Sequence, residues 1–160
     1  MRVVGPSDGA MVRFPGLGTR HLIRSEDTEG RFALVEHDIP PRTLAAPVHT
    51  HQHEDEYSWV ISGRVGVQIG DETLEARPGE LVFKPRGIPH AFWNAGDEEA
   101  RLLELISPGG FEHYFKELEP LLAPGKPRDF EALGAVQARY DLSMDPQSVE
   151  SLMKEHGLTQ

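Results

Sequence analysis

The sequence predicts a mainly β fold, a jelly roll or small β-barrel with short α-helices at its C-terminal end. Two observations favour this class. Glycine and proline are frequent, with 16 and 13 copies in 160 residues, and short apolar runs alternate with turn residues between positions 31 and 107. Many short strands joined by tight turns are typical of β-barrels, whereas a helix bundle needs longer periodic segments.

The chain divides into three expected parts. Residues 1–30 are polar and rich in glycine, and we expect a leader with one or two edge strands there. Residues 31–107 would form the barrel, and residues 108–160 would form a helical extension that packs on it. A length of 160 residues suits one domain with an appended element.

The first strand of the barrel is predicted at residues 31–37, and Pro40 and Pro41 break it because proline cannot donate to a ladder. His37 is expected at the exposed end of this strand. Residues 70–72 are expected to form a hairpin turn between two alternating segments. The further strands follow the same rhythm, at residues 57–62, 64–69, 73–76, 81–84, 90–94 and 101–107.

After residue 107 the apolar residues recur at helical spacing and predict three short helices. Asp129 is expected to cap the second helix. Asp145 would cap the third, with Pro146 as its first residue and Gly157 at its end. The side chains expected along these helices are Phe111, Phe115, Leu118 and Leu122, then Phe130, Leu133, Val136 and Tyr140, then Val149, Leu152 and Met153.

A helical unit of this kind could read DNA, as in regulators that carry one. Acids outnumber bases over residues 111–160, however, and an acidic surface repels phosphate backbones. Packing on the barrel or at a dimer contact is therefore the favoured interpretation.

Residues 48–63 carry the strongest chemical signal. Alternate side chains of an extended strand share a face, so His49 and His51 point the same way, and a carboxylate from the following turn can join them. Two imidazoles and a carboxylate that converge on one point suit a divalent metal. The plainer alternative is a polar loop rich in histidine. The polar part of the segment is His49, His51 and His53, followed by Glu54, Asp55 and Glu56.

A second segment, residues 79–94, places another histidine in an ordered context. An apolar run leads into a Pro-Arg-Gly-Ile-Pro turn, and His90 opens the next apolar strand. Together the two segments resemble the two motifs of the cupin family. The first motif, two histidines followed by a glutamate and a glycine, is matched by His49, His51, Glu56 and Gly63, and the second by Gly79, Pro85, Gly87, His90 and Asn94.

The resemblance implies a double-stranded β-helix with one divalent transition metal held by His49, His51, Glu56 and His90. Three nitrogens and one oxygen suit Fe, Ni, Mn, Cu, Co or Zn. Glu56 would also act as the catalytic base when partly released.

Other residues near the motifs have weaker assignments. His53 and Asn94 are expected to support the ligands from behind, with a surface position for His53 and a turn-fixing role for Asn94 as alternatives. Glu54 and Asp55 are expected to be solvated turn acids, although either could replace Glu56. A substrate pocket is expected to draw on Tyr57, Trp59, Phe83 and Phe92, of which alternation assigns about half to packing.

Composition excludes several classes. A net charge of −10 argues against binding nucleic acid through charge. The absence of cysteine excludes disulfides, thiolate metal sites and cysteine nucleophiles. No apolar run approaches the ~18 residues of a membrane helix, and the first residues lack the core of a signal peptide, so the cytoplasm is the expected compartment.

A fold does not by itself fix an activity. The resemblance to quercetinase-like cupins implies a metal-dependent dioxygenase that combines a small aromatic or enolic substrate with O2. The alternatives are a metal-dependent isomerase or epimerase of a small polar metabolite, and a sensor that binds a ligand or metal without turnover. The resemblance also implies a homodimer.

Overall fold

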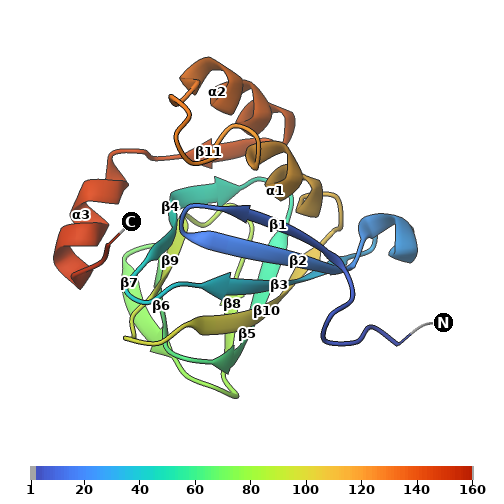
Figure 1. Ribbon diagram of the computed structural model, residues 1–160, viewed down its shortest axis with the longest axis horizontal. Coiled ribbons are helices and arrows are strands. Elements are labelled where there is room, and N and C mark those ends of the chain that lie inside the picture. Colours follow the sequence, from blue (N-terminus) through green and yellow to red (C-terminus); the bar gives the residue numbers. More distant parts are fainter. Residues whose placement is uncertain (1–2, 160) are drawn as a thin grey trace.

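The computed structural model describes residues 3–159. Its strands form two antiparallel sheets that lie face to face and enclose the core (Figure 1). Six strands follow the order β1-β2-β3-β10-β5-β8 and five follow the order β11-β4-β9-β6-β7. The predicted jelly roll is confirmed. The strands are β1 (Ala10–Phe14), β2 (Leu17–Ile23), β3 (Ala33–Ile39), β4 (Leu44–His51), β5 (Asp55–Ser62), β6 (Val65–Ile69), β7 (Glu72–Ala76), β8 (Leu81–Lys84), β9 (His90–Asn94), β10 (Ala100–Ser107) and β11 (Leu142–Met144).

Strand β10 shows why this sequence forms such a barrel. Its side chains alternate between the two faces of the sheet, so Leu102, Glu104 and Ile106 are buried inside while Leu103 and Leu105 lie outside. The apolar inward side chains pack between the two sheets and bury the surface that stabilises the fold. Buried residues of this core include Val35, Ile39, Val60, Val65, Val67, Phe92, Leu102 and Ile106.

A glycine makes the connection from β5 to β6. Gly63 has a φ of 78°, which glycine adopts at little steric cost. A Cβ at this position would lie 2.6 Å from the Cα of Ala100, at the start of β10. The glycine of the first motif is therefore required by the backbone.

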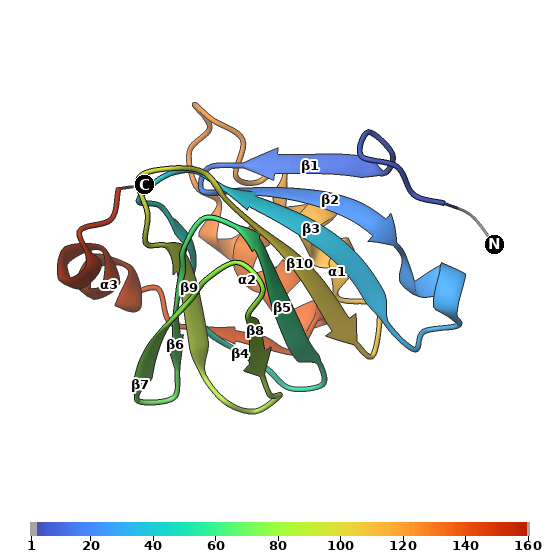
Figure 2. The same ribbon diagram turned by 90° about the horizontal axis from the view of Figure 1, so that it is seen from below.

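The N-terminal strands continue the six-stranded sheet. β2 pairs with β3, and β1 pairs with β2 at the outer edge (Figure 2). On the outer face, the Glu36 carboxylate binds the guanidinium groups of Arg20 and Arg101. The 3-10 helix η1 (Ser25–Thr28) lies between β2 and β3.

The C-terminal segment forms three helices and one further strand. The helices are α1 (Glu112–Leu118), α2 (Phe130–Arg139) and α3 (Ser148–His156). α1 and α2 lie over one end of the barrel, and α3 lies beside β4 (Figure 1). The strand β11 was not predicted, because three residues are too few to show a pattern. β11 pairs with β4, the strand that carries two of the predicted metal ligands.

The helix caps follow the prediction in part. Asp129 accepts a hydrogen bond from the Ala132 backbone and caps α2. α3 begins at Ser148 rather than at Pro146, because the Asp145 carboxylate accepts from the Gln147 backbone and holds a turn before the helix. Gly157 ends α3 with a φ of 61°.

Phe130, the first residue of α2, is 79% exposed. The position predicted for His37 was wrong. His37 is 1% exposed, because β3 continues to Ile39 and places it on the inner face. Its Nδ1 lies 3.0 Å from the Thr19 hydroxyl. In the described part of the chain, no helix is long and apolar enough to cross a membrane.

Candidate metal centre

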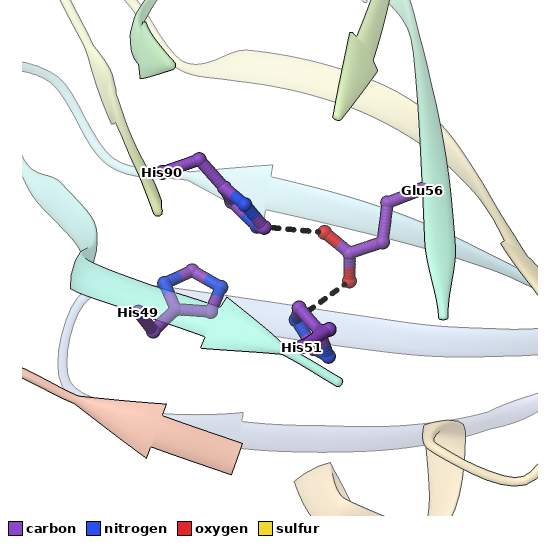
Figure 3. A group of neighbouring side chains, drawn as sticks. All are labelled: His49, His51, Glu56 and His90. Atoms are coloured by element: carbon purple, nitrogen blue, oxygen red, sulfur yellow. Dashed lines mark ion pairs between the residues drawn. The ribbon is translucent and has the colours of Figure 1, made fainter. Parts of the chain in front are cut away.

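Four side chains from three strands meet inside the barrel (Figure 3). β4 contributes His49 and His51, β5 contributes Glu56, and β9 contributes His90. All four are buried, and one nitrogen or oxygen atom of each lies within 4.8 Å of the others. The sequence predicted this set of four residues, and the fold brings them together.

The strand register explains the convergence. β4 pairs with β9, and His49 stands opposite His90 in that ladder. His51 lies two residues further along β4 and therefore on the same face. Glu56 belongs to the other sheet and faces the three imidazoles across the barrel.

Backbone carbonyls fix the tautomers of two of the histidines. The Nδ1 of His49 lies 2.8 Å from the Pro47 carbonyl, and the Nδ1 of His90 lies 3.0 Å from the Ile88 carbonyl. A carbonyl oxygen only accepts, so each Nδ1 carries the proton and each Nε2 keeps a free lone pair. The Nε2 is the nitrogen that points at the other ligands, as a metal-binding imidazole requires.

Burial keeps these imidazoles neutral. Loss of water contact is the main cause that lowers the pKa of His49 well below its usual value, and the same cause lowers the pKa of His90. Burial acts on Glu56 in the opposite direction and raises its pKa, but the nearby Lys84 ammonium favours the ionised form, and the pKa of Glu56 lies well below its usual value. Neutral imidazoles and an ionised carboxylate are the protonation states that bind a metal.

The histidine nitrogens lack partners on the metal side. The Nε2 atoms of His51 and His90 lie 3.4 Å and 3.3 Å from the Glu56 oxygens, and neither has a hydrogen-bond partner among the described residues. Buried polar atoms without partners cost free energy. A cation at their meeting point would remove this cost, so the residues present fit the divalent metal that the resemblance implies.

Glu54 lies behind His51. Its Oε2 is 3.5 Å from the His51 Nδ1, and its side chain is only 12% exposed. This differs from the expected solvated turn acid, because the turn after β4 folds the carboxylate back onto the imidazole. Neither of these two atoms has a hydrogen-bond partner among the described residues, so Glu54 lies beside the imidazole without a hydrogen bond to it. Asp55, by contrast, pairs with Arg86 at the surface.

Two further buried charges adjoin the centre and were not predicted. The Lys84 ammonium lies 2.7 Å from a Glu56 oxygen and 2.6 Å from a Glu104 oxygen. The Ser58 hydroxyl donates to the other Glu104 oxygen at 2.8 Å. Burial raises the pKa of Glu104 to about 7. Burial would lower the pKa of Lys84, but the two carboxylates outweigh it and raise that pKa.

A sequence signal for Glu104 existed. In β10 it stands between Leu102 and Ile106 at the spacing of a strand's inward face. The alternation of side chains along β10 alone therefore places the Glu104 carboxyl group in the core. Lys84 follows Val82 in the same way along β8.

The residues expected to support the ligands lie elsewhere. His53 is exposed in the turn after β4, and its Nε2 lies 2.9 Å from Asp141. Asn94 donates to the Ile39 and Glu98 carbonyls and accepts from the Gly96 backbone. It fixes the turn before β10, which is the alternative role considered for it.

The four aromatic residues expected in a pocket are divided by the sheet. Tyr57, Trp59 and Phe83 point outward, because each lies one residue from an inward side chain of its strand. Trp59 is 46% and Phe83 is 48% exposed. Phe92 points inward, and its ring centroid lies 4.8 Å from the Lys84 Nζ.

Comparisons with known proteins agree with the fold and the motifs. A cupin domain model matches residues 35–106, which include all four candidate ligands. The polyketide cyclase RemF from Streptomyces resistomycificus is 34% identical, with a TM-score of 0.57 over 67% of this chain and 79% of RemF. A predicted oxalate decarboxylase from Thermotoga maritima is 20% identical, with a TM-score of 0.62 over 67% of this chain and 99% of that chain, and shows the fold alone.

Part of the chain also resembles curated Streptomyces proteins. It is 37% identical over 60 residues to the polyketide synthase CurC from Streptomyces cyaneus, and the match covers 38% of this chain and 39% of CurC. The matched segment thus spans well under half of that relative. With the domain match, the likeness to RemF, the double sheet and both motifs in place, the chain belongs to the cupin family.

Proposed function

We propose that this cupin is a metal-dependent enzyme that acts on a small enolic or phenolic substrate. The observation that carries the proposal is the convergence of three imidazoles and one ionised carboxylate on a single buried point. The four ligands would leave part of the coordination sphere of a six-coordinate ion open, and an open position distinguishes a catalytic site from a structural one.

The ion, when bound, would supply Lewis-acid stabilisation for oxygen atoms of the substrate. His49, His51 and His90 would hold it through their Nε2 atoms. Glu56 is ionised, so when partly released from the ion it is the candidate base that accepts a proton from a substrate hydroxyl or from carbon beside a carbonyl. The Lys84 ammonium lies 2.7 Å from this carboxylate and stabilises its negative charge.

Three reactions start from the same enolate. Ring closure of a polyketone is favoured by the 34% identity to RemF, which is named a polyketide cyclase. Reaction of the enolate with O2 is the dioxygenase activity that the quercetinase-like resemblance implies. The metal-dependent isomerase or epimerase would also use such an enolate. A sensor without turnover is the weaker proposal. The buried Lys84 and Glu104 place further ionisable groups beside the centre, and such groups suit acid–base catalysis.

The first experiment measures metal content by mass spectrometry after loading with each candidate ion. We expect about one equivalent in the wild type, and loss in His49→Ala and His90→Ala. His53→Ala is the matched control, because it removes an exposed histidine of the same motif. Absence of metal from the wild type after every loading would contradict the proposal.

The second experiment separates the reactions. The loaded protein is given a synthetic polyketone, a flavonol or a catechol, with and without air. A cyclase forms product under nitrogen, whereas a dioxygenase consumes O2 in step with product. Failure of every substrate with every ion would favour the sensor.

We also propose that the outer face of the six-stranded sheet binds a second copy of the chain. The side chains of Trp59 and Phe83 are exposed on this face, next to a surface hollow of ≈ 460 Å³. A two-fold axis would place the aromatic side chains of one copy in the hollow of the other. Its lining is Leu34, Tyr57, Trp59, Leu81, Leu103, Leu105 and Ser107. Sedimentation should show a dimer that Trp59→Asp dissociates, and a monomeric wild type would contradict this.

A further inference from the structure

The inner face of the six-stranded sheet holds a continuous chain of hydrogen bonds and ion pairs. The Ser58 hydroxyl donates to Glu104 at 2.8 Å, the Lys84 ammonium donates to Glu104 at 2.6 Å, and the same ammonium lies 2.7 Å from Glu56. Lys84 and Glu104 are each only 1% exposed. This series of hydrogen bonds and ion pairs therefore ends at Glu56, the one carboxylate among the candidate metal ligands.

The sheet register fixes these side chains. Glu56 on β5 stands opposite Lys84 on β8, and Ser58 on β5 stands opposite Glu104 on β10. Directly opposed residues on one face of an antiparallel pair lie close enough for their side chains to interact. Lys84 therefore connects the carboxylates of two different strands across β5.

Lys84 is enclosed among its partners within the barrel. Its ammonium meets carboxylate oxygens on two sides, and its Nζ lies 4.8 Å from the centroid of the Phe92 ring. A cation over an aromatic face is attracted to the ring. A buried ammonium that left these partners would lose them without gaining water.

The consequence concerns how Glu56 meets a metal. The ammonium lies 2.7 Å from the Oε2 of Glu56, which also stands 3.3 Å from the Nε2 of His90, whereas the Oε1 of Glu56 stands 3.4 Å from the Nε2 of His51. An ammonium this close to a metal ion would also repel it, unless another negative charge balances the ammonium. Glu104 is the carboxylate placed to do so, because it contacts Lys84 from the other side.

We propose that Lys84 and Glu104 form a counter-charge pair that positions Glu56 as a one-oxygen metal ligand. Lys84 holds one oxygen of Glu56, and Glu104 neutralises Lys84 so that the remaining charge of Glu56 is available to the ion. Both are positioning residues, since neither is a ligand. This inference rests on the metal centre proposed above and would be specific to chains that carry both charges on this face.

The test uses Co²⁺, whose affinity is measured by competition with a chromophoric chelator. The visible absorption of the bound ion reports its coordination geometry. Glu104→Gln keeps an acceptor for Ser58 and Lys84 but leaves the ammonium unbalanced, so Co²⁺ affinity should fall about 10- to 100-fold. The double variant Lys84→Met/Glu104→Gln removes both charges. Its affinity should return toward the wild-type value, while its absorption spectrum changes because both oxygens of Glu56 become free.

The matched control is Arg20→Met/Glu36→Gln, which removes an ion pair from the outer face of the same sheet. It should leave both Co²⁺ affinity and spectrum unchanged, even if it lowers thermal stability. If Lys84 and Glu104 had a purely structural role, Glu104→Gln and Lys84→Met/Glu104→Gln would also leave Co²⁺ affinity and spectrum unchanged.

The outcomes separate the two proposals. If the wild type binds no Co²⁺ or other ion, the metal centre fails and this inference fails with it. If the wild type binds Co²⁺ and Glu104→Gln binds it equally well, the metal centre stands and this inference is overturned. If Glu104→Gln does not fold, the double variant decides, and a wild-type spectrum there would overturn the inference.

Discussion

The two faces of the six-stranded sheet have opposite chemistry, and the inner face is the more polar where it meets the metal centre. Along β5 the inward residues Glu56 and Ser58 are polar and buried, while the outward residues Tyr57 and Trp59 are aromatic. In most sheets with one solvated face the apolar residues face the core. The inversion is local, because Val60 restores an apolar inward position two residues later.

The inversion gives the two faces of one strand different chemistry. Buried charge is costly unless it is paired, and large exposed apolar patches mark interaction surfaces. The inner side chains of β5 lie beside the candidate metal ligands and the buried Lys84, and its outer side chains form the exposed surface that we propose binds a second copy. The ion pairs differ between the two faces in the same way, since the Lys84 side chain is 1% exposed while that of Arg13, which pairs with Asp38, is 61% exposed.

The largest effect is expected from Lys84→Met. This change leaves Glu56 and Glu104 buried without their cation, and breaking a buried pair by removing one partner costs about 3–5 kcal/mol. The outer-face control is Arg13→Ala, whose side chain is 61% exposed and whose loss should cost about 0–1 kcal/mol.

Urea unfolding of the metal-free protein provides the measurement. The contrast between the faces requires that Lys84→Met lower the free energy of unfolding by several times the loss in Arg13→Ala. Equal losses would mean that water or a local rearrangement satisfies the two carboxylates in the variant.

The four candidate ligands were predictable because they lie in contiguous motifs. His49, His51 and Glu56 occur within eight residues of sequence, and His90 follows a turn whose Pro and Gly positions are fixed. The outward position of Tyr57 could also have been predicted from the sequence. Once Glu56 is placed inward, alternation alone sends its neighbour to the other face.

The remaining features depend on long-range pairing. That Lys84 meets both Glu56 and Glu104 follows from the register of three strands, which no local pattern specifies. The pairing of β11 with β4 likewise joins residues about 90 positions apart, as between Leu142 and His51. Local propensity assigns elements well, but the partner of each strand is decided by burial across the whole chain.

Metal binding should stabilise the folded protein only where the candidate ligands inside the barrel are intact. A ligand that binds only the folded state adds about 2.7 kcal/mol at 100 times its Kd. We therefore expect the metal to raise the melting temperature of the wild type and of His53→Ala, but not of His90→Ala. Differential scanning calorimetry at several metal concentrations measures this. A rise in His90→Ala equal to that of the wild type would place the stabilising ion elsewhere.

The smallest expected effect is a difference in acid sensitivity between the two faces of β3. Burial lowers the pKa of His37, on the inner face, to about 3. A group whose pKa is lower in the folded state than its unfolded value of about 6.5 contributes stability above pH 6.5 and loses it as pH falls toward 3. On the outer face, burial raises the pKa of Glu36, but the hydrogen bonds from Arg101 and Arg20 outweigh it and lower that pKa. Its contribution is therefore kept above the usual glutamate pKa of about 4.3 and is lost as pH falls below that value.

The contrast between the two residues can be measured by urea unfolding of metal-free wild type and His37→Gln between pH 7.5 and 5. One protonation site contributes at most about 1.4 kcal/mol per pH unit. The wild type should lose more stability than His37→Gln over this interval, whereas Glu36→Gln should lose as much as the wild type. Glu104 acts in the opposite direction, because its folded pKa of about 7 lies above its unfolded value, but it is common to all three proteins and cancels in the comparison. Parallel pH profiles for the wild type and His37→Gln would show that His37 becomes protonated inside the folded barrel, and that water reaches the inner face more freely than its burial indicates.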